Sequence, residues 1–201
     1  MRFTRICFAA SLVTLTCFAA AQDMTKMSPK KTGPSDAAYR AKALAAAPSA
    51  IAKDAGVGRF DKDGKMQTLR ESKNGFTCML IMDNPMCAYA NSMTFFDAMM
   101  KKEMPPPKLG LTYMLAGDKG ASNTDPTADK KTADNHWVVT GPHVMIVGPE
   151  ARSLGLSESA DADPTKPYMM WAGTPYEHAM IPVGGGKPAT KPMGDRAKPA
   201  N

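Results

Sequence analysis

The sequence predicts an α+β domain in which an antiparallel sheet of about five to seven strands packs against two or three helices. Three observations lead to this class. Short runs rich in β-branched, aromatic and other apolar residues recur between turns rich in Gly, Pro, Asn and Asp. Alanine-rich and methionine-rich stretches of helical length precede or interrupt these runs. About 180 of the 201 residues follow the first apolar segment, enough for one domain with its own core.

The first residues predict a secretory signal peptide that spans positions 1–21. Arg2 and Arg5 precede an apolar run, and Ala19–Ala21 supplies the small residues that signal peptidase requires. We expect cleavage after Ala21 and a periplasmic or secreted mature protein without a transmembrane segment. Cys17 leaves a lipoprotein anchor as the alternative, although the residues before it do not form the small-residue context of a lipid-attachment motif.

The rest of the chain divides into a flexible polar leader (22–35), a single α+β domain (36–183) and a disordered basic tail rich in Gly, Pro and Lys (184–201). The formal net charge is +6, and the signal peptide and the tail carry most of it. No Lys and Arg cluster is interleaved with aromatic residues, so we expect no binding to nucleic acid. The sequence indicates no other partner.

Two helices are predicted at the start of the domain. An alanine-rich stretch predicts a helix over residues 36–47, with Ser35 as its N-terminal cap. A second short helix is expected from Ser49. Pro48 separates the two, because proline lacks an N–H donor and crowds the preceding turn.

The next two elements are predicted to be strands, over residues 66–70 and 76–82. Asn74 and Gly75 form a tight turn signal just before the second strand. We therefore expect the two strands to pair directly as a hairpin.

A third helix is predicted over residues 93–103, with Ser92 as its cap and a proline run ending it. Apolar residues at spacings of three and four predict one buried stripe that belongs to the core. The stripe comprises Met93, Phe96, Met100 and Met104.

The second half of the domain is predicted to contain five strands and a long polar loop over residues 117–135. A structureless loop of this length is unusual within a compact domain unless it serves a purpose. The five strands are expected over residues 109–116, 136–140, 143–147, 168–172 and 178–183.

Cys78 and Cys87 are the two cysteines outside the signal peptide. In an exported protein such a pair predicts a disulfide, which here would close a loop. A copper site built from the two thiols and Met79, Met82 and Met86 between them is the alternative.

Five short segments occur in a fixed order: Asn74–Cys78, Asp83–Cys87, Ala121–Pro126, Gly141–Val147 and Gly173–His178. As a set, between Lys65 and Val183, they resemble a family of uncharacterised secreted bacterial proteins. The resemblance implies an exported, single-domain bacterial protein. It implies no catalytic residue, because that family has no established activity.

Histidine and methionine alternate in two of the predicted strands. His143 is followed two residues later by Met145, and His178 by Met180, so each pair shares one face of its strand. If the two strands pair, the four side chains could converge on a metal. Two imidazoles and two thioethers suit copper(I), and imidazole also suits zinc or copper(II). The alternative is that each histidine is half-buried beside a core methionine.

Two further hypotheses concern chemistry and ligand binding. An enzyme could use His143, His178 and Glu177 as acid and base groups. The sequence contains no Gly-x-Ser-x-Gly, phosphate-loop or His-Glu-x-x-His motif that would support a known reaction class. An aromatic wall for a small ligand could be formed by Tyr168, Trp171 and Tyr176, which also suit ordinary strand packing.

These observations favour an exported bacterial envelope protein that acts as a non-catalytic binding or structural module. Copper or zinc binding through the His and Met face is the first alternative, and an enzyme is the second. No cofactor is firmly implied, and copper and zinc are the candidates.

Overall fold

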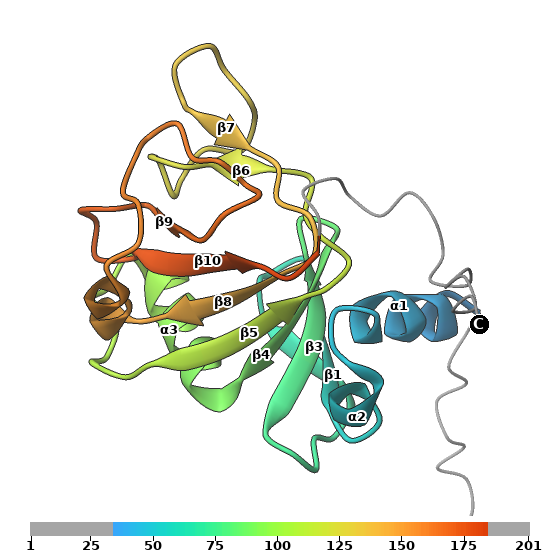
Figure 1. Cartoon of the computed structure of the whole chain (residues 1–201). Helices are drawn as coiled ribbons and strands as arrows, with labels where there is room; N and C mark the ends of the chain where they lie inside the picture. Colours follow the sequence, from blue (N-terminus) through green and yellow to red (C-terminus); the bar gives the residue numbers. More distant parts are fainter. Residues whose placement is uncertain (1–33, 185–201) are drawn as a thin grey trace, which may run out of the picture. The chain divides into compact units, whose positions relative to one another are not determined.

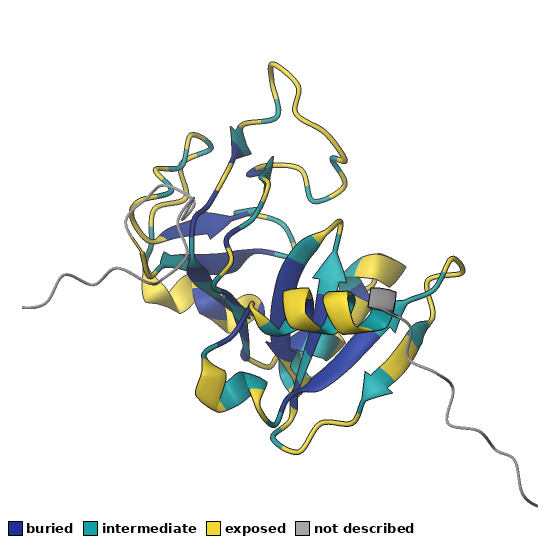
Figure 2. Ribbon diagram, turned by 90° about the vertical axis from the view of Figure 1, so that its right-hand side faces the viewer, coloured by how far each residue is buried: buried dark blue, intermediate teal, exposed yellow. Residues whose placement is uncertain are grey.

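The computed structural model describes residues 34–184, and an eight-stranded twisted sheet forms their centre (Figure 1). The predicted signal peptide, most of the leader and the tail beyond Gly184 lie outside the described residues. Figure 2 shows that the strands are largely buried, whereas the outer faces of the helices are exposed. The predicted α+β class is confirmed, with more strands in the sheet than the five to seven expected.

The strands of the main sheet follow the order β2-β1-β3-β4-β5-β8-β10-β9. Neighbouring strands are antiparallel except β1 and β3, which run parallel. Strands β6 and β7 form a separate two-stranded sheet. The strands are β1 (Gly56–Phe60), β2 (Met66–Arg70), β3 (Phe76–Ile81), β4 (Asn84–Tyr89), β5 (Gly110–Met114), β6 (Ala121–Ser122), β7 (Trp137–Val138), β8 (His143–Val147), β9 (Tyr168–Met170) and β10 (His178–Pro182).

Helices cover both faces of the sheet. The α-helices are α1 (Pro34–Leu44), α2 (Ser49–Ala52) and α3 (Ala90–Lys101), and η1 (Pro149–Leu154) is a 3₁₀ helix. Ala43 of α1, with Ala46 and Ala47 just after it, packs on the face that carries the cysteines, whereas Phe95 of α3 packs on the opposite face. Between residues 34 and 184, no helix has the length and hydropathy needed to cross a bilayer.

The predicted hairpin between residues 66–70 and 76–82 is wrong, because β1 lies between the two strands. The glycines of β1 explain both why the sequence does not predict this strand and why it packs closely against its neighbours. A Cβ atom on Gly56 would lie 3.1 Å from Ser72, and one on Gly58 would lie 2.8 Å from the sulfur of Met66. Glycine weakens the strand signal in a sequence, yet it lets the neighbouring chain approach closely.

The predicted disulfide between Cys78 and Cys87 is confirmed, but it joins two strands and does not close a loop. The two cysteines are direct partners in the β3–β4 pairing, with their Cα atoms 3.9 Å apart. The connecting turn consists of Met82 and Asp83, both with positive φ (46° and 67°), as a two-residue hairpin turn requires. The sequence does not predict strand β4, because Asp83, Asn84 and Pro85 are typical of a turn.

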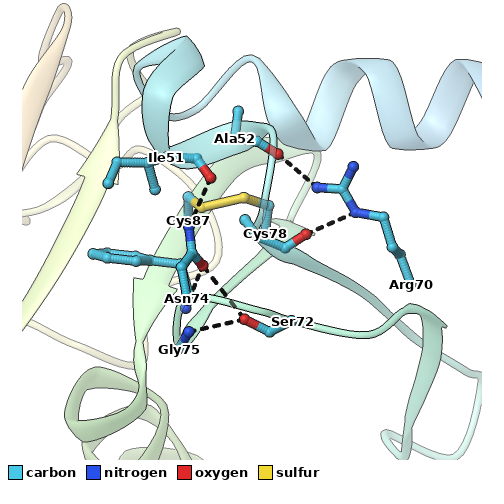
Figure 3. Close-up of a disulfide and its surroundings, with 10 residues drawn as sticks. Ile51, Ala52, Arg70, Ser72, Asn74, Gly75, Cys78 and Cys87 are labelled. Carbon is cyan, nitrogen blue, oxygen red and sulfur yellow. Dashed lines mark hydrogen bonds between the residues drawn. A yellow bond between two sulfur atoms is a disulfide. The ribbon is translucent and has the colours of Figure 1, made fainter.

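The disulfide is fully buried beneath the first two helices (Figure 3). Side chains from the end of β2 and from the turn after it hold α2 above the disulfide. The Arg70 guanidinium donates to the carbonyl of Ala52 at 2.6 Å, and the Asn74 amide donates to the carbonyl of Ile51 at 2.9 Å. Because alternate residues of a strand point to opposite faces, Met79 lies on the other side of the sheet from the two sulfurs.

Helix α3 begins at Ala90, and its buried face differs from the predicted one. Ser92 does not cap the helix: it is fully buried, and its hydroxyl donates to the carbonyl of Leu111 at 2.9 Å. The predicted core stripe is wrong, because Met100 and Met104 are 55% and 77% exposed. The predicted stripe also included Met93 and Phe96, which are half-buried, whereas the buried positions are Ser92, Phe95 and Ala98.

The predicted polar loop over residues 117–135 contains the short strand β6, which pairs with β7. Strand β7 is shorter than the predicted strand 136–140. Asn123 and Trp171 connect this small sheet to the main one, because the backbone N–H of Trp171 donates to the Asn123 carbonyl at 2.9 Å. Residues 117–135 are therefore held by contacts next to β9, the edge strand of the main sheet.

Candidate functional site

A pocket with a volume of about 180 Å³ lies on the face of the sheet opposite the disulfide. Strands β3, β4, β5, β8, β9 and β10 contribute its floor, and α3 contributes Phe96, Met99 and Met100. The segment over residues 117–135 supplies a further wall, so this segment has a structural role at the site. Its lining residues are Asp118, Gly120, Ala121, Ser122, Asp125, Pro126 and Ala128.

Methionine dominates the lining, and strand pairing explains why so many thioethers meet. Met79 lies opposite Met86, and Met145 lies opposite Met180. Since alternate residues share a face, these pairs point to the same side of the twisted sheet. The lining methionines are Met79, Met82, Met86, Met99, Met100, Met114, Met145, Met170 and Met180.

His143 begins β8, lines the pocket and has no exposed surface. Its Nδ1 lies 2.7 Å from the carbonyl oxygen of Gly141, so the proton belongs on Nδ1. The buried Nε2 then carries a free lone pair, and it has no hydrogen-bond partner. Burial lowers the pKa of His143, although the Gly141 carbonyl and the Asp118 carboxylate oppose this effect. The imidazole is therefore neutral at pH 7.

His178 begins β10 and has a similar arrangement. Its Nδ1 donates to the carbonyl of Tyr176 at 3.0 Å, and its ring makes an edge contact with Trp171 at 4.8 Å between centroids. Burial lowers the pKa of His178 from 6.5 to about 4. Both histidines thus present neutral rings to an apolar pocket.

The β8–β10 register places the two histidines at opposite ends of the pairing. His143 lies opposite Pro182, whereas His178 lies opposite Val147. Their Cα levels differ by four residues along the strands, or roughly 13 Å at the usual rise. Met145 and Met180 occupy the space between them, directly opposite each other. All four residues of the predicted His and Met face line the pocket, but the two histidines do not occupy neighbouring positions in the strand pairing.

Asp118 was not singled out from the sequence, yet it supplies a carboxylate to the pocket lining. The backbone N–H groups of Gly120 and Thr140 donate to its Oδ1 at 2.8 and 2.9 Å. Burial raises the pKa of Asp118, and these two hydrogen bonds and the electrostatic interaction with His143 act in the opposite direction. Asp118 and His143 are thus electrostatically linked in one corner of the pocket.

The three aromatic residues of the predicted ligand wall have different positions. Trp171 lines the pocket, and its Nε1 donates to the carbonyl of Ser122 at 2.8 Å. Tyr168 lies in the core, where its hydroxyl is 2.8 Å from that of Thr140. Tyr176 packs against the same core from a half-buried position. Of the three, Trp171 alone belongs to the lining.

Glu177 lies beside η1, away from the pocket lining. The Arg152 guanidinium donates to both of its carboxylate oxygens, at 2.8 and 2.7 Å, and the N–H of Gly173 donates at 3.0 Å. These hydrogen bonds, led by that from Arg152, lower the pKa of Glu177. Glu177, the proposed acid–base carboxylate, is therefore held in an ion pair with Arg152 and is not part of the lining that contains His143.

The side chains of the lining that could bind a metal are mostly thioethers and imidazoles, together with the carboxylates of Asp118 and Asp125. Within residues 34–184, no three side chains of His, Cys, Asp and Glu come together in a way that could hold a metal ion. Both cysteines are in the disulfide on the opposite face, so the copper site proposed from the thiols and the intervening methionines does not form. A metal in the pocket would depend on sulfur from methionine.

In comparisons with known proteins, no family model, curated protein or solved structure matches this chain.

Proposed function

We propose that this protein is an exported, non-catalytic binding module of the bacterial envelope, and that its ligand occupies the methionine-lined pocket. The unpaired Nε2 of His143 is the observation that carries the proposal. A buried acceptor without a partner costs roughly 1–3 kcal/mol, and native proteins contain few of them. A ligand that engages this nitrogen removes that cost.

The surroundings of His143 favour binding over catalysis. Most side chains that line the pocket are apolar, and such walls with few polar groups are typical of small-ligand sites. The ion pair between Glu177 and Arg152 removes one member of the acid–base trio from the site. Binding needs only the apolar walls and one nitrogen that accepts a hydrogen bond or a metal.

Indole is a suitable probe, because it combines an apolar ring with one N–H donor for His143. We expect indole to shift the methyl NMR signals of Met145 and Met180 in protein labelled with [methyl-¹³C]methionine. The signal of Met169, buried on the other face of β9, should move less. Equal shifts at all methionines would contradict a pocket-specific ligand.

A bulky residue on the loop wall tests the same site without altering the sheet. Ala128→Trp should fill the pocket and abolish the indole-induced shifts, because Ala128 is part of the lining. Thr127→Trp is the matched control, since Thr127 is exposed and lies outside the lining. If Ala128→Trp binds indole as the wild type does, the ligand does not occupy this pocket.

Export is tested by the mass of the protein recovered from the periplasm of an expressing bacterium. We expect a mature chain that begins at Gln22, because the signal peptide predicts cleavage after Ala21. Ala19→Arg/Ala21→Arg should leave the uncleaved precursor, because arginine replaces the small residues that precede the cleavage site. A cytoplasmic protein that keeps residues 1–21 in the wild type would refute export.

A further inference from the structure

We propose that the ligand of the pocket is Cu(I), bound by the Nε2 of His143 and the thioether sulfurs of Met114 and Met145. This inference rests on the proposed binding function and names the class of its ligand. The ligand is a soft monovalent cation held by one imidazole and two thioethers.

Strand pairing brings these three residues together. Met114 of β5 is the direct cross-strand partner of His143. Met145 is two residues beyond His143 on β8, so both point into the pocket. Met180 lies opposite Met145 and is available as a further sulfur donor. Methionine has three rotatable side-chain bonds, which allow its sulfur to reach a shared position beside the imidazole.

The orientation of His143 is that of a metal ligand. A metal-binding histidine almost always donates its other ring N–H to a carbonyl or carboxylate, and this hydrogen bond fixes the ring. His143 donates from Nδ1 to the Gly141 carbonyl, and Nε2 is left buried and unpaired. The side chain therefore has its supporting hydrogen bond in place and lacks only a partner at the coordinating atom.

The chemistry of the donors selects the ion. Thioethers are soft ligands that prefer Cu(I), whereas zinc takes thiolate, imidazole and carboxylate in tetrahedral sites. The described residues offer no trio of His, Cys, Asp and Glu for zinc. A single positive charge also suits a site with few charged groups, and the carboxylate of Asp118 in the same lining offers partial compensation.

Two exposed methionines of the lining would give a soft ion a route inward. Met82, on the turn between β3 and β4, is 74% exposed, and Met100 on α3 is 55% exposed. Both belong to the pocket lining although they are largely solvent-accessible. A Cu(I) ion could thus pass from thioether to thioether between solvent and His143.

The test is anaerobic titration of the full mature protein with Cu(I) in competition with the chelator bicinchoninate. Ascorbate keeps copper reduced and avoids thiols that would open the disulfide. We expect one Cu(I) per chain in the wild type. Met114→Leu and Met145→Leu should each weaken binding by more than about tenfold, the lower end of what even outer partners of metal ligands contribute.

Met169→Leu is the matched control, because Met169 is equally buried but packs on the other face with Ala151 and Ala179. Exchanging Met for Leu nearly conserves volume and apolar character, so each variant should still fold, which urea unfolding verifies. No transfer of Cu(I) to the wild type would overturn the inference. Equal losses in Met145→Leu and Met169→Leu would also overturn it.

Indole separates failure of the copper assignment from failure of the binding function. The wild type should bind indole through the apolar wall and His143, whether or not it also binds Cu(I). Indole binding without Cu(I) binding would reject copper and keep the ligand pocket. Loss of both in the wild type would reject the pocket as a binding site altogether.

Discussion

The double variant Cys78→Ala/Cys87→Ala should be less stable to unfolding than the oxidised wild type by roughly 2–3 kcal/mol. The disulfide joins residues that are nine apart in sequence, so it restricts a short ring in the unfolded chain. Replacing both cysteines avoids a single unpaired thiol in the core, where both positions are fully buried. Urea denaturation followed by circular dichroism measures the change.

Reduction of the wild type provides the control for this variant. The reduced protein keeps both sulfur atoms, so any loss of stability relative to the oxidised protein reports the covalent link and not the packing. The pocket lies on the opposite face of the sheet, so indole binding should persist below the unfolding transition. Identical urea midpoints for oxidised, reduced and substituted protein would show that the link contributes nothing.

Acidification should destabilise the protein through His178, by about 3 kcal/mol between pH 7 and pH 4. The pKa of this histidine is about 4 in the folded state, whereas the ordinary value is 6.5. At a pH between the two pKa values, His178 is protonated in the unfolded chain and neutral in the folded chain. The stabilising contribution is therefore complete above pH 6.5 and is lost as the pH falls towards 4.

His178→Asn isolates this contribution, because the asparagine amide can still donate to the Tyr176 carbonyl but does not titrate. We expect the variant to lose much less stability than the wild type across this pH range, as measured by urea unfolding at each pH. Its stability at pH 8 should be lower, because the smaller side chain leaves space beside Trp171. A variant that follows the wild-type pH dependence would show that another group is responsible.

Local patterns were sufficient to predict the α+β class, the disulfide and the shared face of His143 and Met145. Each of these depends on residue types or on the two-residue period of a strand. Local patterns could not predict that His143 and His178 lie at opposite ends of the β8–β10 pairing. The register of this pairing depends on the long connection between the two strands.

The residues that sequence analysis missed reach the site through long-range contacts. Met114 lies beside His143 only because β5 pairs with β8. Asp118 accepts a hydrogen bond from the backbone N–H of Thr140, which is 22 residues further along the chain. The β3–β4 turn at Asp83 is stabilised by ion pairs with Lys42 and Lys119, which come from distant segments. None of these pairings leaves a periodic signal in the sequence.

Ser92 shows how tertiary packing can override a local preference. Serine before a helical pattern predicts an N-terminal cap, yet the close approach of Gly110 draws Ser92 into the core. A Cβ atom on Gly110 would lie 2.6 Å from the backbone nitrogen of Ser92, so only glycine fits there. The helix begins earlier as a result, and its buried face rotates away from the predicted methionine stripe.

Residues 117–135 form a pocket wall whose sequence can change with little effect on the folding of the main sheet. This wall contains only the short strand β6 and does not pair with the main sheet, whereas the methionine floor is part of that sheet. Insertions or replacements in the wall can alter the shape of the pocket while the sheet and its disulfide stay intact. A chain with a different wall would therefore keep one stable framework while the shape of the proposed ligand pocket changes.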